Sequence, residues 1–122
     1  MHLPPYAVLL GLHADPDSPG ELVMPWGDHV TGRPEFIHGG ALAGLLEIAA
    51  LAEARRHLGG RPAKPVGISM EYLRGGRAAE TRAAATVVRL GRTVANLSAT
   101  AWQESRDKPI AAARLTLLLG DQ

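Results

Sequence analysis

The longest apolar stretch of the chain predicts one enclosed helix. Residues 41–58 are rich in Ala and Leu, contain no Pro, become charged near their end and stop at Gly59-Gly60. Within residues 41–52, apolar side chains surround the helix axis and Glu47 is the only ionisable group. A surface helix would have a polar face, so we expect other parts of the fold to enclose its first three turns.

The remaining apolar segments have the pattern of strands. Large apolar residues alternate with smaller or polar ones in residues 66–72, which is the period of a half-buried strand. The joins between the later segments are too short for crossover helices and favour an antiparallel meander. Residues 27–36 are polar and irregular, and long loops of this kind often carry function. The predicted strands are residues 6–13, 21–26, 66–73, 79–90, 93–102 and 110–119.

This order of elements predicts an α+β fold in which an antiparallel sheet of five to six strands wraps one long central helix. A length of 122 residues fits a single domain that covers residues 1–122. Such a sheet leaves its strand edges open and the helix partly uncovered. We therefore expect a homodimer, or a homotetramer made of two such dimers.

Composition excludes several classes of function. A formal net charge of +1 argues against a nucleic-acid partner. The absence of cysteine excludes disulfide scaffolds, thiolate metal sites and cysteine nucleophiles. The histidines lack a His-x-x-x-His spacing, so we expect no metal. No apolar run approaches the roughly 20 residues of a membrane span, and no secretory signal pattern opens the chain, which predicts a cytoplasmic protein without a membrane partner.

Glu47 is the strongest candidate for chemistry. Its neighbours Leu46 and Ile48 are apolar, and burial makes the charged form of a carboxylate costly. Carboxylates in such surroundings often act as general bases or nucleophiles. The structural alternative is a carboxylate that caps a loop or pairs with an arginine in a subunit interface.

Gly39-Gly40, at the predicted helix start, forms a second candidate. Free backbone N–H groups and the positive end of the helix dipole favour a developing negative charge there, although two glycines can also simply make a tight turn. Gly40 and Glu47 share a helix face but lie about 10 Å apart along the axis. Both could act on one ester only if the glycine comes from one subunit and the carboxylate from the other.

Three motifs follow one another along the chain. They are His38-Gly39-Gly40 with an acid nine residues after the histidine, Ile68-Ser-Met-Glu-Tyr-Leu-Arg, and Arg89-Leu-Gly-Arg-Thr-Val-Ala. Together they resemble the hotdog acyl-CoA thioesterases of the phenylacetate-degradation type, in register over roughly residues 20–119. The resemblance implies the hotdog fold and hydrolysis of an acyl-CoA thioester to free acid and CoA. It implies no cofactor beyond the CoA that the substrate carries.

The resemblance also assigns catalytic residues. It implies that the amide of Gly39 or Gly40 polarises the thioester carbonyl and that Glu47 is the general base or nucleophile. His38 belongs to the same motif, where it can orient the loop by hydrogen bonds. Two positions depart from the family pattern. An Asn six residues before the histidine is Gly32 here, and Asp28, His29 or Thr31 could take its role. The Ser or Thr that some members carry near the first long strand is also missing.

Arginines at two strand junctions could meet the phosphates of CoA. Arg74, Arg77 and Arg92 are the candidates, because guanidinium groups suit phosphate, and the alternative is ordinary surface charge. Two other functions fit the same fold. One is a non-catalytic acyl-CoA-binding dimer, and the other is a dehydratase or hydratase acting on acyl-CoA or acyl carrier protein.

Overall fold

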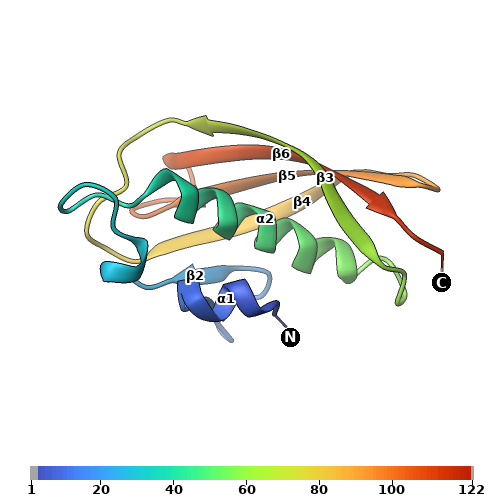
Figure 1. Ribbon diagram of the computed structural model, residues 1–122, viewed down its shortest axis with the longest axis horizontal. Coiled ribbons are helices and arrows are strands. Elements are labelled where there is room, and N and C mark those ends of the chain that lie inside the picture. Colours follow the sequence, from blue (N-terminus) through green and yellow to red (C-terminus); the bar gives the residue numbers. More distant parts are fainter. Residues whose placement is uncertain (1–2, 122) are drawn as a thin grey trace.

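The computed structural model describes residues 3–121 and shows one antiparallel sheet wrapped around a long helix (Figure 1). The long helix, α2, spans Gly39–Arg55, so it begins two residues earlier and ends three residues earlier than predicted. The strand order in the sheet is β1-β2-β4-β5-β6-β3. The fold therefore confirms the predicted α+β architecture. The strands are β1 His13–Ala14, β2 Leu22–Met24, β3 Ala63–Tyr72, β4 Thr81–Leu90, β5 Val94–Trp102 and β6 Pro109–Leu119; α1 spans Pro5–Leu10 and the 3-10 turn η1 spans Asp28–Val30.

The core lies between α2 and the inner face of the sheet. Leu45 and Leu46 of α2 are completely buried, and β5 alternates strictly between buried and partly exposed residues up to Ala101. Alanines on the inner faces of β4, β5 and β6 leave room for the helix to lie close to the sheet. Enclosure of α2 is thus confirmed on its sheet side. On the outer side, Gly40, Ala43 and Glu47 remain partly or fully exposed.

The first predicted strand, residues 6–13, is wrong, because residues 5–10 form the helix α1. Pro5 occupies the first helical position, where its fixed φ favours a helix. Gly11 ends the helix with φ 71°, and its N–H donates to the Val8 carbonyl at 3.1 Å. A short apolar run does not by itself distinguish a helix from a strand. Here Ala7 and Leu10, three residues apart, turn inward.

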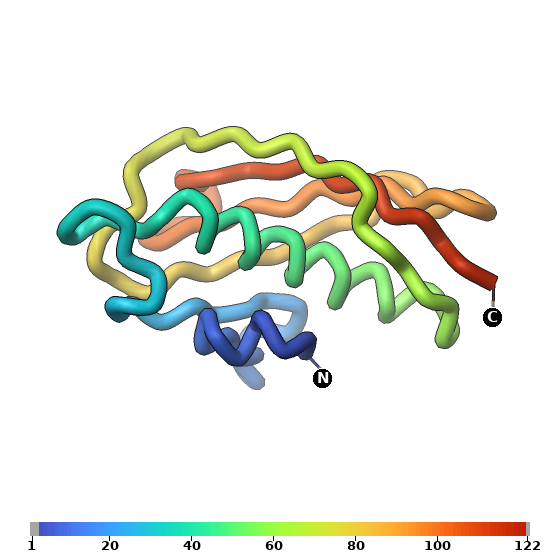
Figure 2. Tube along the Cα trace, viewed as in Figure 1, coloured from blue at the N-terminus to red at the C-terminus, as the bar shows by residue number. Residues whose placement is uncertain are grey.

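The predicted meander holds only for β4, β5 and β6. β3 pairs with β6 and not with β4, so residues 73–80 pass across the end of the sheet to reach β4, as Figure 2 shows. β3 is consequently an edge strand. Its alternating residues were predicted to be half-buried, yet Val66 and Tyr72 are each 55% exposed and Ile68 is 42% exposed. Within residues 3–121 no second layer covers these side chains, which corrects the prediction of burial.

Candidate active site

The His38-Gly39-Gly40 motif forms the N-terminus of α2. His38 is the N-cap residue, and its Nδ1 accepts a hydrogen bond from the Gly40 N–H at 2.8 Å. The His38 carbonyl accepts from the N–H of Ala41 at 3.0 Å. Because Nδ1 is an acceptor, a neutral His38 carries its ring proton on Nε2. The histidine therefore fixes the first turn of the helix.

Gly39 has the amide that remains available. Within residues 3–121 its N–H has no hydrogen-bond acceptor, whereas the Gly40 N–H is occupied by the His38 ring. At a helix N-terminus such an unpaired donor is aligned with the positive end of the dipole. Of the two glycines that the sequence left open, Gly39 is the one whose amide can still donate to a ligand.

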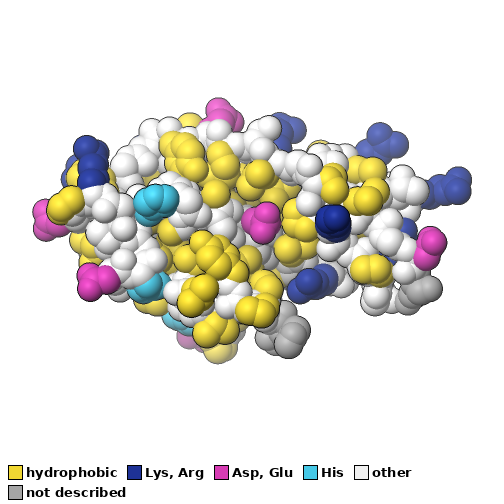
Figure 3. Space-filling model, viewed as in Figure 1, with side chains coloured by type: hydrophobic (Ala, Val, Ile, Leu, Met, Phe, Trp, Pro, Cys, Tyr) yellow, Lys and Arg dark blue, Asp and Glu magenta, His cyan; other side chains and the backbone are white. Residues whose placement is uncertain are grey.

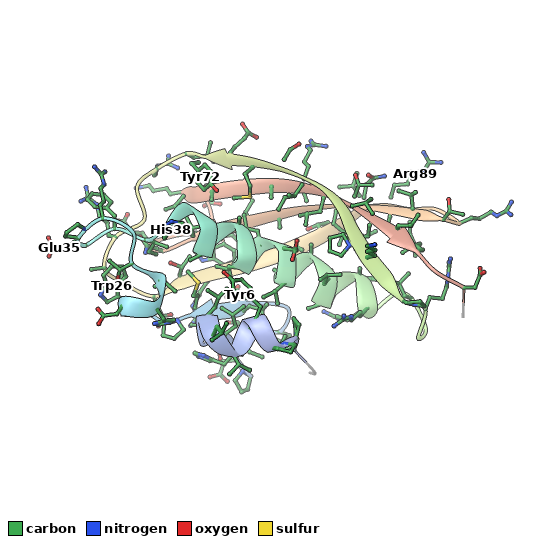
Figure 4. The ribbon with its side chains drawn as sticks, viewed as in Figure 1. Tyr6, Trp26, Glu35, His38, Tyr72 and Arg89 are labelled. Carbon is green, nitrogen blue, oxygen red and sulfur yellow. The ribbon has the colours of Figure 1, made fainter. Side chains whose placement is uncertain are left out.

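Tyr72, on β3, lies directly against Gly39. Its O–H donates to the Gly39 carbonyl at 3.1 Å, and a Cβ on Gly39 would lie 3.2 Å from the Tyr72 ring. Figure 4 shows this tyrosine beside the first turn of α2, close to His38. The absence of a side chain at Gly39 is what permits this close packing. Tyr72 belongs to the second motif, but the sequence does not mark it as a site residue, because only the fold brings that strand to the helix start.

A hollow opens beside this helix start. It has a volume of about 420 Å³ and contains His38, Gly39 and Tyr72 together with Arg33 and Arg74. No acidic residue lines it. Positive charge from two arginines and from the helix dipole thus favours an anionic or strongly polarised group in the hollow.

Gly32 also lines the hollow, and the space that a side chain would need there is occupied. A Cβ on Gly32 would lie 3.0 Å from the His38 Cα. Of the polar residues considered as substitutes for the family Asn, Thr31 donates its hydroxyl to the Gly27 carbonyl at 2.8 Å and His29 Nε2 lies 3.1 Å from the Leu10 carbonyl. These two side chains hold the loop itself. Among the residues that line the hollow, the side chains with a polar group are Arg33, His38, Tyr72 and Arg74.

Glu47 lies two turns further along α2, on its outer face. It is half-buried and not enclosed, and within the described part of the chain its carboxylate has no hydrogen bond or ion pair. Figure 3, drawn with α2 toward the reader, shows an acidic side chain over the middle of that helix with hydrophobic side chains around it. The prediction that apolar structure encloses this group does not hold in the single chain, because the outer face of α2 is uncovered. Gly39 and Glu47 are eight residues apart, about 12 Å along the axis, so one chain does not bring them together.

The three candidate arginines are divided between the two ends of the molecule. Arg74 lines the hollow with Gly39, and Arg74 and Arg77 both line an adjoining hollow of about 350 Å³. Arg92 instead lies beyond the end of α2, in a basic hollow with His57 and Arg61. In Figure 4 Arg89, which lines the same hollow, marks that end, opposite His38. The single chain therefore associates two of the three arginines with the helix start.

Residues 3–121 contain neither a metal-binding cluster nor a membrane-spanning helix. No group of three or more His, Asp or Glu side chains is arranged to hold a metal ion. The helices of this part of the chain are all too short or too polar to span a membrane.

Comparison with known proteins identifies the family. Residues 29–118 match the model of the acyl-CoA thioesterase N-terminal domain, and no curated protein matches the chain. Thioesterase HI1161 from Haemophilus influenzae is 26% identical, with a TM-score of 0.81 over 93% of this chain and 81% of that one. Protein BH2602 from Bacillus halodurans, crystallised with CoA, is 23% identical, with a TM-score of 0.83 over 93% and 74%. A phenylacetic acid degradation-related protein from Ralstonia eutropha JMP134 is 24% identical, with a TM-score of 0.81 over 97% and 92%.

These matches confirm the resemblance and the hotdog fold that the three motifs indicated. The matched segment contains the whole of α2 and strands β3 to β5, together with all but the last residue of β6. It therefore includes His38, Gly39, Gly40, Glu47 and the three candidate arginines. The chain belongs to the acyl-CoA thioesterase family and has the hotdog fold of a thioester hydrolase.

Proposed function

We propose that the protein hydrolyses an acyl-CoA thioester in a site built by two subunits. The Gly39 N–H of one subunit would hold the carbonyl oxygen, and Glu47 of the partner subunit would activate water or attack the carbonyl carbon. The observation that carries this proposal is the unpaired Gly39 N–H, which lies at a helix N-terminus in a hollow without acidic groups.

The chemistry follows from where charge develops. Attack on the thioester carbon converts the carbonyl oxygen into an oxyanion, which the Gly39 N–H and the helix dipole stabilise. Glu47 either accepts a proton from the attacking water or forms an anhydride that water then cleaves. In both routes the C–S bond breaks, the CoA thiolate leaves and takes up a proton, and the free acid is released. His38 is a positioning residue, because its ring fixes the Gly40 amide and with it the first helical turn.

An antiparallel dimer supplies the geometry that one chain lacks. β3 has a strand neighbour on one side only, and its exposed Val66 and Ile68 suit pairing with a second β3. If the two α2 helices run antiparallel, Gly39 of one lies opposite Glu47 of the other when the symmetry axis passes near Ala43. The outer face there carries the small residues Gly40 and Ala43, which permit a close approach of the helices.

The same pairing also gives Arg92 a place in the site. Arg92 lies near the start of β3, because its carbonyl accepts a hydrogen bond from the Arg61 side chain at 2.7 Å. Antiparallel pairing sets the start of one β3 beside the end of the other, which is where Tyr72 and Gly39 lie. Arg74 and Arg77 of one subunit and Arg92 of the partner subunit would then surround one CoA molecule.

The first test is thiol release from a panel of acyl-CoA esters by the parent and by Glu47→Gln. This change removes the charge and nearly keeps the shape. We expect the loss of a general base or nucleophile to lower kcat about 100-fold or more. Glu53→Gln is the matched control, because Glu53 is on the same helix but pairs with Arg56 and His57. Thiol release by Glu47→Gln at the rate of the control would refute the assigned role of Glu47.

A subunit-mixing experiment tests whether the site is shared. Glu47→Gln keeps Gly39, and a second inactive variant, Gly39→Pro, keeps Glu47 but lacks the amide N–H. In a mixed dimer one of the two sites is intact, so random exchange should restore about a quarter of the parent activity. Mixing without recovery would place both groups of a site in one chain. If the parent binds acyl-CoA esters but releases no thiol from any, the alternative of a non-catalytic binding dimer replaces the hydrolase.

A further inference from the structure

The tip of the loop that precedes α2 carries two stacked guanidinium groups. Arg33 lies 4.0 Å and Arg77 lies 4.7 Å from the centre of the Phe36 ring. Backbone pairing between Phe36 and Arg77, and a 2.9 Å hydrogen bond from the Ile37 N–H to the Gly76 carbonyl, join the loop to the segment after β3. Phe36 thus holds together two cations from segments that are distant in the sequence.

These cations have no acidic partners. Among residues 3–121, Arg33, Arg74 and Arg77 form no ion pair, whereas Arg82 contacts three carboxylates. Arg74 donates through Nη1 to the Pro109 carbonyl at 2.7 Å, which fixes the side chain and leaves other N–H donors free. Unpaired guanidinium groups held by stacking and by a backbone carbonyl are prepared to bind an anion.

The cations follow a path that leads away from Gly39. Arg33 and Arg74 line the hollow that contains Gly39, and Arg74 and Gly75 also line the adjoining one. Arg77 and Lys108 lie in that second hollow, with Glu104 as the acidic residue among its lining. A ligand that reacts at Gly39 and extends along this path would therefore end among three cations.

We infer that Arg33, Arg74, Arg77 and Lys108 bind the nucleotide phosphates of CoA, and that Phe36 holds Arg33 and Arg77 in position. This inference rests on the proposed function, because it assumes that the reacting thioester lies at Gly39. It adds Arg33, Phe36 and Lys108 to the site. It also makes the enzyme selective for CoA esters: a pantetheine ester has no phosphate, and an acyl carrier protein offers one phosphodiester in place of the three phosphate groups of CoA.

The test compares one acyl group on two carriers. We expect Arg33→Gln and Arg77→Gln each to raise the KM for acyl-CoA about tenfold, the size of effect that one charge-assisted contact gives. Arg77→Gln should leave kcat unchanged, because Arg77 does not line the hollow that contains Gly39. The KM for the matching acyl-pantetheine ester should stay within about twofold of the parent, because it lacks the phosphates. Phe36→Leu removes the ring and keeps an apolar side chain. It should likewise raise the KM for acyl-CoA and leave the KM for the acyl-pantetheine ester nearly unchanged. Arg106→Gln is the matched control, since Arg106 also stacks on an aromatic ring, that of Trp102, at 5.0 Å but lines neither hollow.

Several results would overturn the inference. If the variants raise the KM for both esters equally, the stacked arginines merely support the loop. If neither KM rises, the phosphates of CoA bind elsewhere. If the variants lose activity toward an acylated acyl carrier protein but not toward acyl-CoA, the cations bind the carrier protein instead of CoA. Calorimetry with CoA, dephospho-CoA and pantetheine keeps the two proposals separate. If the parent releases no thiol but Arg33→Gln weakens CoA binding and not pantetheine binding, the hydrolase proposal fails and the phosphate site stands.

Discussion

The Gly39 amide can be deleted without disturbing the backbone around it. Gly39→Pro removes the N–H at the first helical position, where proline is well tolerated. The preceding residue, His38, already has φ −64° and ψ 133°, the region that a residue before proline prefers. The deleted N–H has no acceptor within residues 3–121, so its removal breaks no intramolecular bond of that part of the chain.

Gly39→Ala is the matched comparison. Both variants place a Cβ about 3.2 Å from the Tyr72 ring, so both require the ring to move by a few tenths of an ångström. Only the proline lacks the donor. Loss of one oxyanion donor lowers kcat by about 10²–10³-fold, and we expect this difference between the proline and alanine variants.

The assay is thiol release at saturating acyl-CoA, with thermal unfolding measured on both variants. The two unfolding temperatures should be similar, because proline replaces an unpaired amide. If the proline variant has the same kcat as the alanine variant, the Gly39 N–H is not the oxyanion donor. If both variants lose activity equally, the contact between Gly39 and Tyr72 is what the reaction requires.

Four further outcomes are expected. His38→Ala should lower the unfolding free energy by about 1 kcal/mol, the value of an N-cap, and should lower activity. His38→Asn can cap the helix, so it should restore both stability and activity. If His38→Asn is stable but inactive, the imidazole itself takes part in the reaction. Tyr72→Phe should lower kcat severalfold with little change in KM, because the first helical residue loses its 3.1 Å hydrogen bond, as steady-state kinetics would reveal. Gly32→Asn, which installs the family residue, should lower the unfolding free energy by about 1–3 kcal/mol without raising activity, because its Cβ would lie 3.0 Å from the His38 Cα. The pKa of Asp15 is lowered by hydrogen bonds from the Asp17 backbone N–H and from Arg82 of β4. The ionised Asp15 carboxylate therefore stabilises the fold above about pH 4, and this stabilisation disappears as the pH falls further. The unfolding free energy of Asp15→Asn should depend less on pH than that of the parent in this acidic range.

Local patterns were sufficient for the elements that depend on neighbouring residues. The Ala- and Leu-rich run before Gly59 predicted α2, and alternation predicted the strand that became β3. The His38-Gly39-Gly40 motif and Glu47 were recognised because capping, dipole and helical spacing are properties of consecutive residues. The family followed from the same motifs, and the match over residues 29–118 confirmed it.

Tertiary structure alone decided which distant segments meet. Long-range packing makes β6 the neighbour of β3 and brings Tyr72 into contact with Gly39. Only the structure shows that the Gly39 amide is free while the Gly40 amide is bonded to His38. Residues 6–13 were misread as a strand for the same reason, because their apolar composition is compatible with both states. Short-range pattern sets the period of a segment, but the partners available in three dimensions select its final conformation and its neighbours.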